Sequence, residues 1–406
     1  MDMLNYDICI VGAGAAGLWA AEACARRGVS TLVVEKTNKT GTKILSSGGT
    51  RCNLTTTLDP TAAAGWFGEA KRFVMPALRN LSPQDVRARF EALGVRTKEE
   101  EEFEKVFPRS DSALEVRNAL EAAARRAGAV FRFNSAVTSV EQEGSGWCVH
   151  GASFRARCSR LLLCVGGKSY PKTGTTGDGY AWLEALGLEV VRPVPALVPL
   201  SSDAKWAKEL SGLSVDVEIK AGAFRRRRPV LFTHRGLSGP GAMDVSEAVS
   251  RGTANTVRMD LYPEVSWERL RDDLVALGQR PGSPGLMSVL SIPKRLAQAL
   301  FVKAGMQGTN PRANLMTKPQ RNKLVDALKG LEVPVTGTLG YGKAEVTAGG
   351  LALSEVRRQT MEVRRFPGLY VFGELLNLQG PIGGFNFQAA FATAELAAAA
   401  ACDVAS

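Results

Sequence analysis

Histidine and closely paired cysteines are scarce in this sequence, and their scarcity excludes several kinds of site. The chain has two histidines, His150 and His234, and none of its seven cysteines forms a Cys-x-x-Cys pair. Zinc and iron–sulfur centres need clusters of such ligands, so we expect no metal site. Several cysteines lie in apolar runs and no signal peptide is visible, which favours unpaired core thiols in a reducing cytoplasm.

Long uncharged apolar runs are also missing. No stretch reaches membrane-spanning length without a charge, so we expect no membrane partner. The Ala-rich stretch 389–401 is too short and contains Glu395, which favours a terminal packing helix. With 45% hydrophobic and 22% charged residues over 406 positions, the composition is that of a globular protein with two or three domains. The oligomeric state stays open.

Negative charge is in deficit, because the net charge of the chain is +11. This excess suits an anionic cofactor, an anionic substrate or weak affinity for nucleic acid. The positive residues are spread along the chain, and no nucleic-acid motif with interleaved aromatic residues is present. A basic solvated surface is therefore the simpler interpretation, and we favour a small-molecule substrate over a nucleic-acid partner.

The first forty residues contain a dinucleotide-binding pattern. An apolar run at 7–11 leads into G-x-G-x-x-G, a stretch of helix formers at 15–27 follows, and a second apolar run at 31–34 ends at Glu35. Gly12 allows a tight turn, Gly14 lets a pyrophosphate approach the backbone, and Gly17 lets the helix pack against the strand. The phosphates would lie at the helix N-terminus, with the Glu35 carboxylate on the ribose hydroxyls. The pattern predicts bound FAD or NAD.

Three later stretches extend this prediction. The polar loop 41–55 has paired glycines, Gly48 and Gly49, and can pass close to a flat ring. The apolar run 160–167 predicts a buried strand that returns to the ligand crevice. Residues 368–374, 375–384 and 385–401 predict a strand, a loop and a helix. A helix N-terminus aimed at a flavin would stabilise negative charge at N1 and the C2 carbonyl.

The middle of the chain has a different composition. Three prolines within 192–199 indicate a domain boundary. Residues 213–219 and 230–233 are typical of strands, and we interpret Arg225 to Arg228 between them as a charged hairpin tip. Residues 267–331 are typical of helices, with a break at 281–285. Strands are expected at 130–133, 136–141 and 147–154 as a meander. The chain thus begins and ends in one cofactor domain, into which a middle part is inserted.

At this level of detail the sequence resembles the bacterial FAD flavoproteins related to aminoacetone oxidase, a group also linked to the reduction of bile-acid enones. The resemblance covers nearly the whole chain. It rests on GAGAAG at 12–17, GTKILSSGGTRCNLT at 41–55, VFP at 106–108, GGKSYPKTGTTGDGY at 166–180, LVPL at 197–200, FTHRGLSGPG at 232–241, VTAGG at 346–350 and GLYVFGELLNLQGPIGGFNFQ at 368–388.

The resemblance implies an α/β fold in three parts. These are a split Rossmann-like FAD-binding domain at 1–190 and 345–406, an inserted β-barrel-like domain at 191–262 and 332–344, and a small helical domain at 263–331. It also implies a set of FAD-binding residues. Phosphate contacts fall on Gly12, Ala13, Gly14, Ala15, Ala16 and Gly17, and ribose contacts fall on Glu35 with Lys36. One side of the isoalloxazine lies against Lys43, Ser46, Gly48, Gly49, Arg51 and Asn53, with Cys52 and Gly166 also assigned to the cofactor. The other side of the isoalloxazine is covered by Gly373, Glu374, Gly383, Gly384, Phe385 and Asn386, and the Val137 backbone contacts adenine.

Two departures from the family pattern put contacts to the edge of the cofactor or to the substrate in question. The family often has Gly-Arg-Lys where this chain has Gly41, Thr42 and Lys43, and Gly-Arg where it has Glu104 and Lys105. Neither departure affects the residues expected to hold FAD.

The leading functional hypothesis is an FAD-dependent oxidoreductase that acts on a small molecule by hydride transfer at flavin N5. It is either an oxidase of an amine or alcohol, or a reductase that NAD(P)H visits transiently, since no second complete G-x-G-x-x-G is present. Candidate groups on the substrate side are Lys168, Tyr170, Lys172 and His234, the last as a base.

Two alternatives remain open. The net charge and the run Arg225 to Arg228 motivate a nucleic-acid-linked flavoprotein. A flavin-based redox sensor without small-molecule turnover would instead use Cys52 as its responsive thiol.

Overall fold

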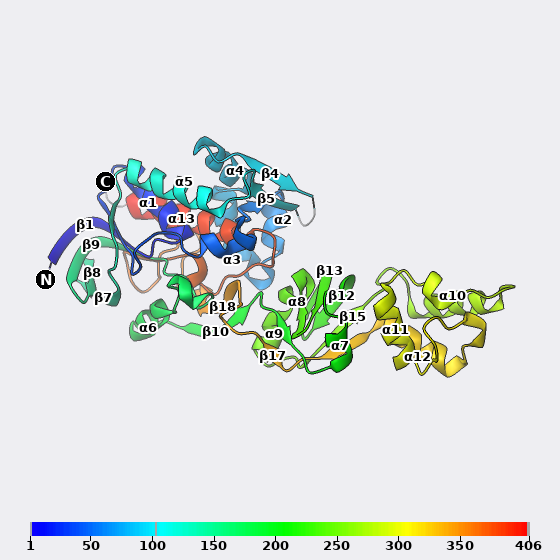
Figure 1. Cartoon of the computed structure of the whole chain (residues 1–406). Coiled ribbons are helices and arrows are strands. Elements are labelled where there is room, and N and C mark those ends of the chain that lie inside the picture. The colour runs from blue at the N-terminus through cyan, green and yellow to red at the C-terminus, as the bar shows by residue number, and fades with distance from the viewer. Residues whose placement is uncertain (1, 102–103, 404–406) are drawn as a thin grey trace. The chain divides into compact units, whose positions relative to one another are not determined.

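The computed structural model describes residues 2–101 and 104–403, and their contacts divide the chain into two units. The first unit is Met1–Val194 with Glu345–Ser406, and the second is Pro195–Ala344. The chain therefore starts and finishes in the same unit, as the blue and red ends of the colour scale show in Figure 1. None of the described helices is long and apolar enough to cross a membrane.

A seven-stranded sheet forms the centre of the first unit. Its order is β6-β2-β1-β9-β8-β7, with β19 also paired to β9. The strands are β1 (Asp2–Val11), β2 (Thr31–Val34), β6 (Val130–Arg132), β7 (Val137–Glu143), β8 (Gly146–Gly151), β9 (Phe154–Leu163) and β19 (Leu369–Val371). Strands β6, β2, β1, β9 and β19 run parallel, whereas β7, β8 and β9 form an antiparallel meander. The prediction that 130–133 belongs to the meander is wrong, because β6 pairs with β2.

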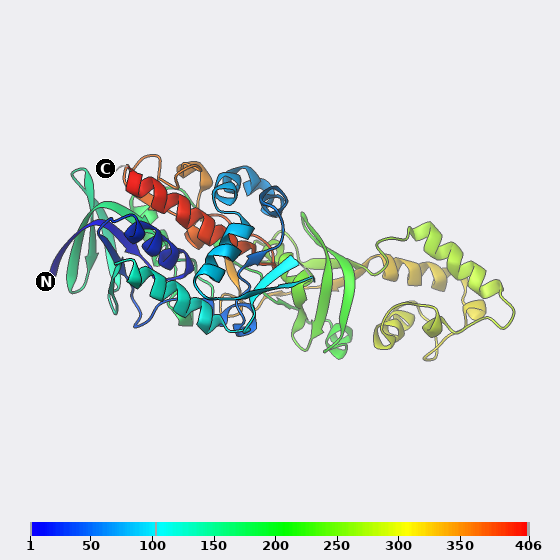
Figure 2. The same ribbon diagram turned by 90° about the horizontal axis from the view of Figure 1, so that it is seen from above.

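Three helices lie side by side against this sheet, α1 (Ala15–Arg26), α5 (Ala113–Arg126) and α13 (Phe385–Asp403) (Figures 1 and 2). The Ala-rich helix α13 is buried along much of its length, because small side chains let it approach α1 closely. The Trp19 ring packs on Phe391 with 4.9 Å between centroids, and its Nε1 donates to Glu395 at 2.8 Å. The predicted terminal packing helix is confirmed.

The remaining elements of the first unit surround this core. They are α2 (Pro60–Gly65), α3 (Lys71–Asn80), α4 (Pro83–Ala92), α6 (Asp178–Ala185), a three-stranded sheet of β3 (Thr55–Thr56), β5 (Lys105–Pro108) and β4 (Thr97–Glu100), and a two-stranded sheet of β10 (Val190–Ala196) and β18 (Val346–Leu351). Ser82 begins α4 with a capping box, in which Ser82 and Asp85 exchange side-chain and backbone hydrogen bonds.

The second unit contains a seven-stranded antiparallel sheet of order β16-β15-β12-β13-β14-β11-β17. Its strands are β11 (Leu200–Ser201), β12 (Ser214–Ala221), β13 (Phe224–Thr233), β14 (Gly236–Ser238), β15 (Thr256–Asp260), β16 (Leu331–Pro334) and β17 (Gly337–Thr338). The two edge strands follow one another in the chain, and a closed barrel stays a prediction.

The run Arg225 to Arg228 is not a hairpin tip, so that interpretation is wrong. All four arginines lie inside β13, and the turn comes earlier, where Gly222 has a φ of +54°. Alternation explains the error. Arg228 points to the buried side of the sheet, where it forms an ion pair with Asp244, while Arg225 and Arg227 point outward.

The helices of the second unit form two groups. Helices α7 (Lys205–Glu209), α8 (Gly239–Asp244) and α9 (Ser246–Ser250) pack against the sheet. Helices α10 (Trp267–Gln279), α11 (Lys294–Lys303) and α12 (Lys318–Lys329) pack together around their own buried leucines (Figure 1). The helices predicted for 267–331 are therefore present, and α10 ends just before the expected break.

Candidate cofactor site

Four loops of the first unit follow the carboxyl ends of parallel strands. Gly12 follows β1, Glu35 follows β2, Gly166 comes soon after β9, and Gly373 comes soon after β19. Because parallel strands end at the same edge, these loops share one edge of the sheet, where ligands bind in doubly wound folds. The opening and closing motifs of the chain meet here, since a Cβ added to Gly373 would lie 3.1 Å from the Cβ of Ala16.

The turn between β1 and α1 is shaped for an anion. Gly12 has a φ of +105°, and a Cβ there would lie 2.9 Å from the carbonyl oxygen of Cys164. A Cβ on Gly17 would lie 1.9 Å from the Gly12 oxygen, so only glycine fits. Gly14 is the N-cap of α1, has no side-chain capping bond, and leaves open space where its Cβ would be. The first N–H groups of α1 thus form an uncapped positive end that fits a diphosphate.

Glu35 is held at the mouth of this turn. Its Oε2 accepts a hydrogen bond from the Ala13 N–H at 2.9 Å, and its Oε1 accepts from the N–H and Oγ1 of Thr37 at 2.8 and 2.9 Å. A carboxylate fixed beside the turn suits a ribose, because its remaining lone pairs can accept hydrogen bonds from the ribose hydroxyls. The neighbouring Lys36 turns instead to the loop after β9, where its Nζ donates to Thr176 at 2.5 Å and Asp178 at 2.6 Å.

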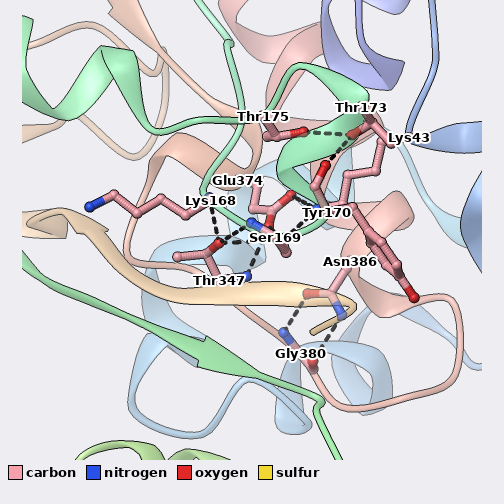
Figure 3. Close-up of polar contacts among 10 residues, drawn as sticks. All are labelled: Lys43, Lys168, Ser169, Tyr170, Thr173, Thr175, Thr347, Glu374, Gly380 and Asn386. Carbon is pink, nitrogen blue, oxygen red and sulfur yellow. Dashed lines mark hydrogen bonds and ion pairs between the residues drawn. The ribbon is translucent and has the colours of Figure 1, made fainter. Parts of the chain in front are cut away.

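A polar network joins the loops at the same edge (Figure 3). The Lys43 ammonium forms an ion pair with Glu374 and donates to the Ser169 Oγ at 2.8 Å. The second oxygen of Glu374 accepts from the Ser169 Oγ and from the Thr347 N–H, each at 2.8 Å. The Thr347 Oγ1 accepts from the N–H groups of Lys168 at 2.8 Å and Ser169 at 3.2 Å. One carboxylate thus holds four separate segments together.

The loop 41–55 has an unusual backbone at its centre. Gly48, Gly49, Thr50 and Cys52 all have positive φ angles, between +53° and +72°. Such angles strain a residue that has a Cβ, and strained backbone tends to persist at functional sites. The loop is tied to the entrance of α13, because the Asn53 amide oxygen, when it faces Gly384, accepts from the Gly384 N–H at 2.8 Å.

Arg51 in this loop is committed to protein partners. Its guanidinium donates to Asp111 at 2.7 Å, pairs with Glu100, and lies 4.1 Å from the centre of the Phe107 ring. Cys52 is completely buried, and burial raises the pKa of its thiol to about 12. A redox-responsive thiol needs exposure and thiolate character, so this location argues against the sensor hypothesis.

The loop before α13 is braced by a side chain from the first turn of that helix, Asn386. The Asn386 Oδ1 accepts from the Gly380 N–H at 2.9 Å and its Nδ2 donates to the Gly380 carbonyl at 2.9 Å (Figure 3). Gly383 and Gly384 both have positive φ, and a Cβ on Gly384 would lie 2.3 Å from the Thr55 oxygen. Phe385, the first residue of α13, is buried. This places the N-terminus of α13 beside the loop 41–55.

The candidate groups on the substrate side are dispersed. Tyr170 has a φ of +53° and is half-buried, and burial together with the Glu345 carboxylate raises the pKa of its phenol. The Lys168 ammonium extends away from the network (Figure 3), and Lys172 is exposed in the short turn Pro171–Thr173. His234 is exposed in the turn between β13 and β14 of the second unit. Val137 begins β7 at the sheet edge.

Sequence reasoning missed two members of the network, Ser169 and Thr347. Thr347 carried a readable signal, because it is a polar residue in β18, a strand that is otherwise apolar or glycine and is buried throughout. A hydroxyl in such a strand must find a partner. Ser169 is fully buried in a loop that is rich in hydroxyls and cations, and the sequence alone does not single it out from the other hydroxyls.

Comparison with known proteins identifies the family. The family described as HI0933-like protein Rossmann domain matches residues 6–400. The chain belongs to this family. It is 32% identical to the ribosomal RNA dihydrouridine synthase of Escherichia coli strain K12, over 97% of each chain. It is 30% identical to the 3-dehydro-bile acid delta(4,6)-reductase of Clostridium scindens, over 98% of this chain and 99% of the relative. The resemblance found from the motifs is thereby confirmed.

Solved structures agree on the fold of this HI0933-like protein. A quinol–fumarate reductase matches with a TM-score of 0.52 and 15% identity, over 99% of this chain and 72% of that one. The 3-ketosteroid delta1-dehydrogenase of Sterolibacterium denitrificans matches with a TM-score of 0.52 and 14% identity, over 98% and 100%. The chain therefore has an α/β, Rossmann-type flavoprotein fold, and the uncapped start of α1 fits the diphosphate of FAD.

Proposed function

We propose that this chain is an FAD-dependent reductase that saturates a carbon–carbon double bond conjugated to a carbonyl group, and that its substrate is uridine in ribosomal RNA. The carrying observation is the 32% identity to two ribosomal RNA dihydrouridine synthases, over 97% and 95% of this chain. The similarity spans both units, so it includes the inserted part as well as the cofactor site. Formation of dihydrouridine saturates the C5–C6 bond of uridine, which is conjugated to the C4 carbonyl.

The charge of the chain supports a nucleic-acid substrate. A net charge of +11 favours a polyanion over a neutral or singly charged small molecule. This reverses the preference for a small-molecule substrate that we drew from the sequence, because the first two relatives are named for their action on ribosomal RNA.

The first unit offers the residues that would hold the cofactor. FAD, when bound, supplies hydride chemistry at N5. The uncapped N–H groups at the start of α1 would bind its diphosphate, and Glu35 would accept from its ribose. The Lys43–Glu374 network would keep the loops around the ring in place. We expect FAD to be held tightly without a covalent bond, and NAD(P)H to visit the site transiently as the electron donor.

Tyr170 is our candidate for the donor of the proton that saturation of the double bond requires. A tyrosine phenol carries its proton at neutral pH even at its ordinary pKa of about 10, and burial with the Glu345 carboxylate raises the pKa of Tyr170 further in the same direction. Its left-handed backbone, directly after the anchored Ser169, fixes where the side chain starts. A general acid must hold its proton before transfer, and Tyr170 meets that requirement.

A second candidate substrate is a small enone. The observation that favours it is the 30% identity, over nearly the whole chain, to a reductase of 3-dehydro-bile acids. The two candidates share the conjugated double bond and differ in size and charge.

Product analysis separates the two. The purified holoprotein is incubated anaerobically with NADPH or NADH and either ribosomal RNA that lacks dihydrouridine or a 3-oxo-Δ4,6 bile acid, and products are measured by mass spectrometry. Dihydrouridine in the RNA supports the proposal, and a saturated bile acid alone supports the second candidate. No reduced product from either substrate, despite rapid loss of the flavin absorbance, would overturn both.

A further inference from the structure

The helical part of the second unit holds a long segment without a single acidic residue. From Leu274 to Val325 the chain has eight lysines and arginines and no aspartate or glutamate; the eight are Arg280, Lys294, Arg295, Lys303, Arg312, Lys318, Arg321 and Lys323. Their summed charge is +8, whereas the net charge of the whole chain is +11. The positive charge is thus concentrated here, contrary to our reading of it as spread along the chain.

These eight side chains are available to a partner. All but Arg321, which is partly buried, are exposed. In the part of the chain that the structure describes, no carboxylate forms an ion pair with any of the eight. The sheet of the same unit is different, because there Arg225 pairs with Glu218, Arg227 with Glu264 and Arg228 with Asp244. What distinguishes the segment from Leu274 to Val325 is that its eight cations have no acidic residue within the segment to pair with.

We propose that this surface, formed by α11, α12 and the loops around them, binds the sugar–phosphate backbone of RNA. Call it the basic helical surface, with the eight residues given above. The inference rests on the proposed function and adds which part of the chain holds the RNA. Repeated positive charges with no acidic residue between them in the sequence match a repeated anion, whose binding releases counterions.

The arrangement of the helices disfavours two other partners. The apolar faces of α11 and α12 are buried in the unit, through Leu296, Leu300, Leu324 and Leu328. They therefore cannot enter a lipid surface, as the apolar face of a membrane-binding helix does. The large apolar side chains that the basic helical surface exposes are Val302 and Leu315, each 74% exposed, which is little for a protein–protein interface.

Two of the eight cations are held in place by the second unit itself. The Arg295 guanidinium donates to the carbonyl oxygens of Glu209 and Ser211, and the Lys303 ammonium lies 4.6 Å from the centre of the Trp206 ring. Lys294 and Lys318 stand at the first positions of α11 and α12, and neither helix has an acid in its first turn. Cations at a helix start oppose the helix dipole, so these two lysines do not serve the stability of their helices.

This last point provides a clean variant. Lys294→Glu and Lys318→Glu place acids where helices prefer them, so the double variant should fold at least as well as the wild type. A matched control is Lys71→Glu with Arg72→Glu, two exposed cations at the start of α3 in the first unit. Both double variants change the net charge by the same amount.

The experiment measures the affinity of the three holoproteins for a ribosomal RNA fragment at several salt concentrations. We expect the Lys294/Lys318 variant to bind about tenfold or more weakly, with a salt slope shallower by about 2, and the control to change about twofold at most. Equal losses in both variants, or no loss in either, would overturn the proposal. So would a Lys294/Lys318 variant that loses binding to phosphatidylserine vesicles while keeping its RNA affinity.

Activity separates this inference from the proposed function. If the wild type forms dihydrouridine and the Lys294/Lys318 variant does so with an unchanged KM for RNA, the inference fails and the proposed function stands. If the wild type forms none yet its RNA binding depends on Lys294 and Lys318, the inference stands and the proposed function fails.

Discussion

Lys43 and Glu374 form an ion pair between positions 331 residues apart in the chain. The pair joins the loop after β2 to the loop after β19, so it closes the cofactor edge from both ends of the sequence. Ser169 and Thr347 add bonds to the same carboxylate, and its two oxygens are therefore fully engaged. A carboxylate with this many partners fixes the positions of the loops that supply them.

Replacing this carboxylate tests its positioning role. We expect Glu374→Gln to weaken FAD binding by on the order of tenfold, because the bonds from Lys43 and Ser169 lose the negative charge of their acceptor. The measurement is the FAD dissociation constant by fluorescence titration of the apoprotein. Glu395→Gln is the control, since Glu395 of α13 forms an ion pair with Arg27 and accepts a hydrogen bond from Trp19, away from the cofactor edge. Equal effects in the two variants would contradict a specific role for Glu374.

A charge placed at the N-cap of α1 should separate folding from cofactor binding. Gly14 has extended backbone and open space at its Cβ position, so aspartate fits there and is a favoured N-cap residue. We expect Gly14→Asp to keep the apoprotein stability within about 0.5 kcal/mol and to lower FAD affinity by about 10²-fold, by repulsion of the diphosphate. Gly14→Ser, which caps the helix without adding a charge, should lose much less FAD affinity. FAD content and apoprotein melting report the two effects, and retention of FAD by Gly14→Asp would contradict the site.

Cys52 gives a pH prediction. Burial raises its pKa from 9.0 to about 12, so the folded state holds the thiol proton more tightly than the unfolded state. The stability that this supplies is complete below pH 9 and is lost as the pH rises from 9 through 12. At pH 8.5 we expect Cys52 to be alkylated about 10³-fold more slowly in the native protein than in urea.

Peptide mass spectrometry measures this rate for each cysteine. Cys402 is the internal comparison, because a hydrogen bond with Cys24 lowers its pKa. Native alkylation of Cys52 as fast as that of Cys402 would revive the redox-sensor hypothesis.

Tyr170 should affect product formation and leave flavin reduction unchanged. Removal of the phenol oxygen in Tyr170→Phe takes away the proposed proton donor, for which a loss of about 10²-fold in kcat is typical. Anaerobic bleaching of the flavin by NADPH should keep its wild-type rate, and the KM for RNA should change little. A variant with normal kcat, or one with bleaching slowed to the same extent, would rule out Tyr170 as the proton donor.

The Rossmann part of the fold could be predicted because its determinants are local. Gly12 and Gly17 each meet a steric constraint, from the backbone after the adjoining strand and from the turn itself, whereas Gly14 leaves open space at the helix start, and β2 is a short run of buried residues. The same holds for α13, because a run of alanines strongly favours a helix and its small side chains favour close packing. Patterns of this kind identify the element and its place in the fold.

The network around Glu374 could not be predicted, because its partners are brought together only by the sheet order. Ser169 and Thr347 lie 178 residues apart, and nothing in either neighbourhood indicates the other. The four arginines of β13 were misplaced for a related reason. A charged run predicts exposure, but the strand period sends every second side chain inward, and Asp244 provides a partner for Arg228.

The central claim is best tested by anaerobic stopped-flow absorbance of the purified protein. The flavin is first reduced with NADPH, and its reoxidation is then followed after mixing with ribosomal RNA that lacks dihydrouridine, or with the same RNA already modified. We predict flavin absorbance bands in the protein as purified, bleaching by the donor, and return of the bands only with the unmodified RNA. A protein that lacks these bands and takes up no added FAD, or a reduced flavin that stays bleached with unmodified RNA, would contradict the account.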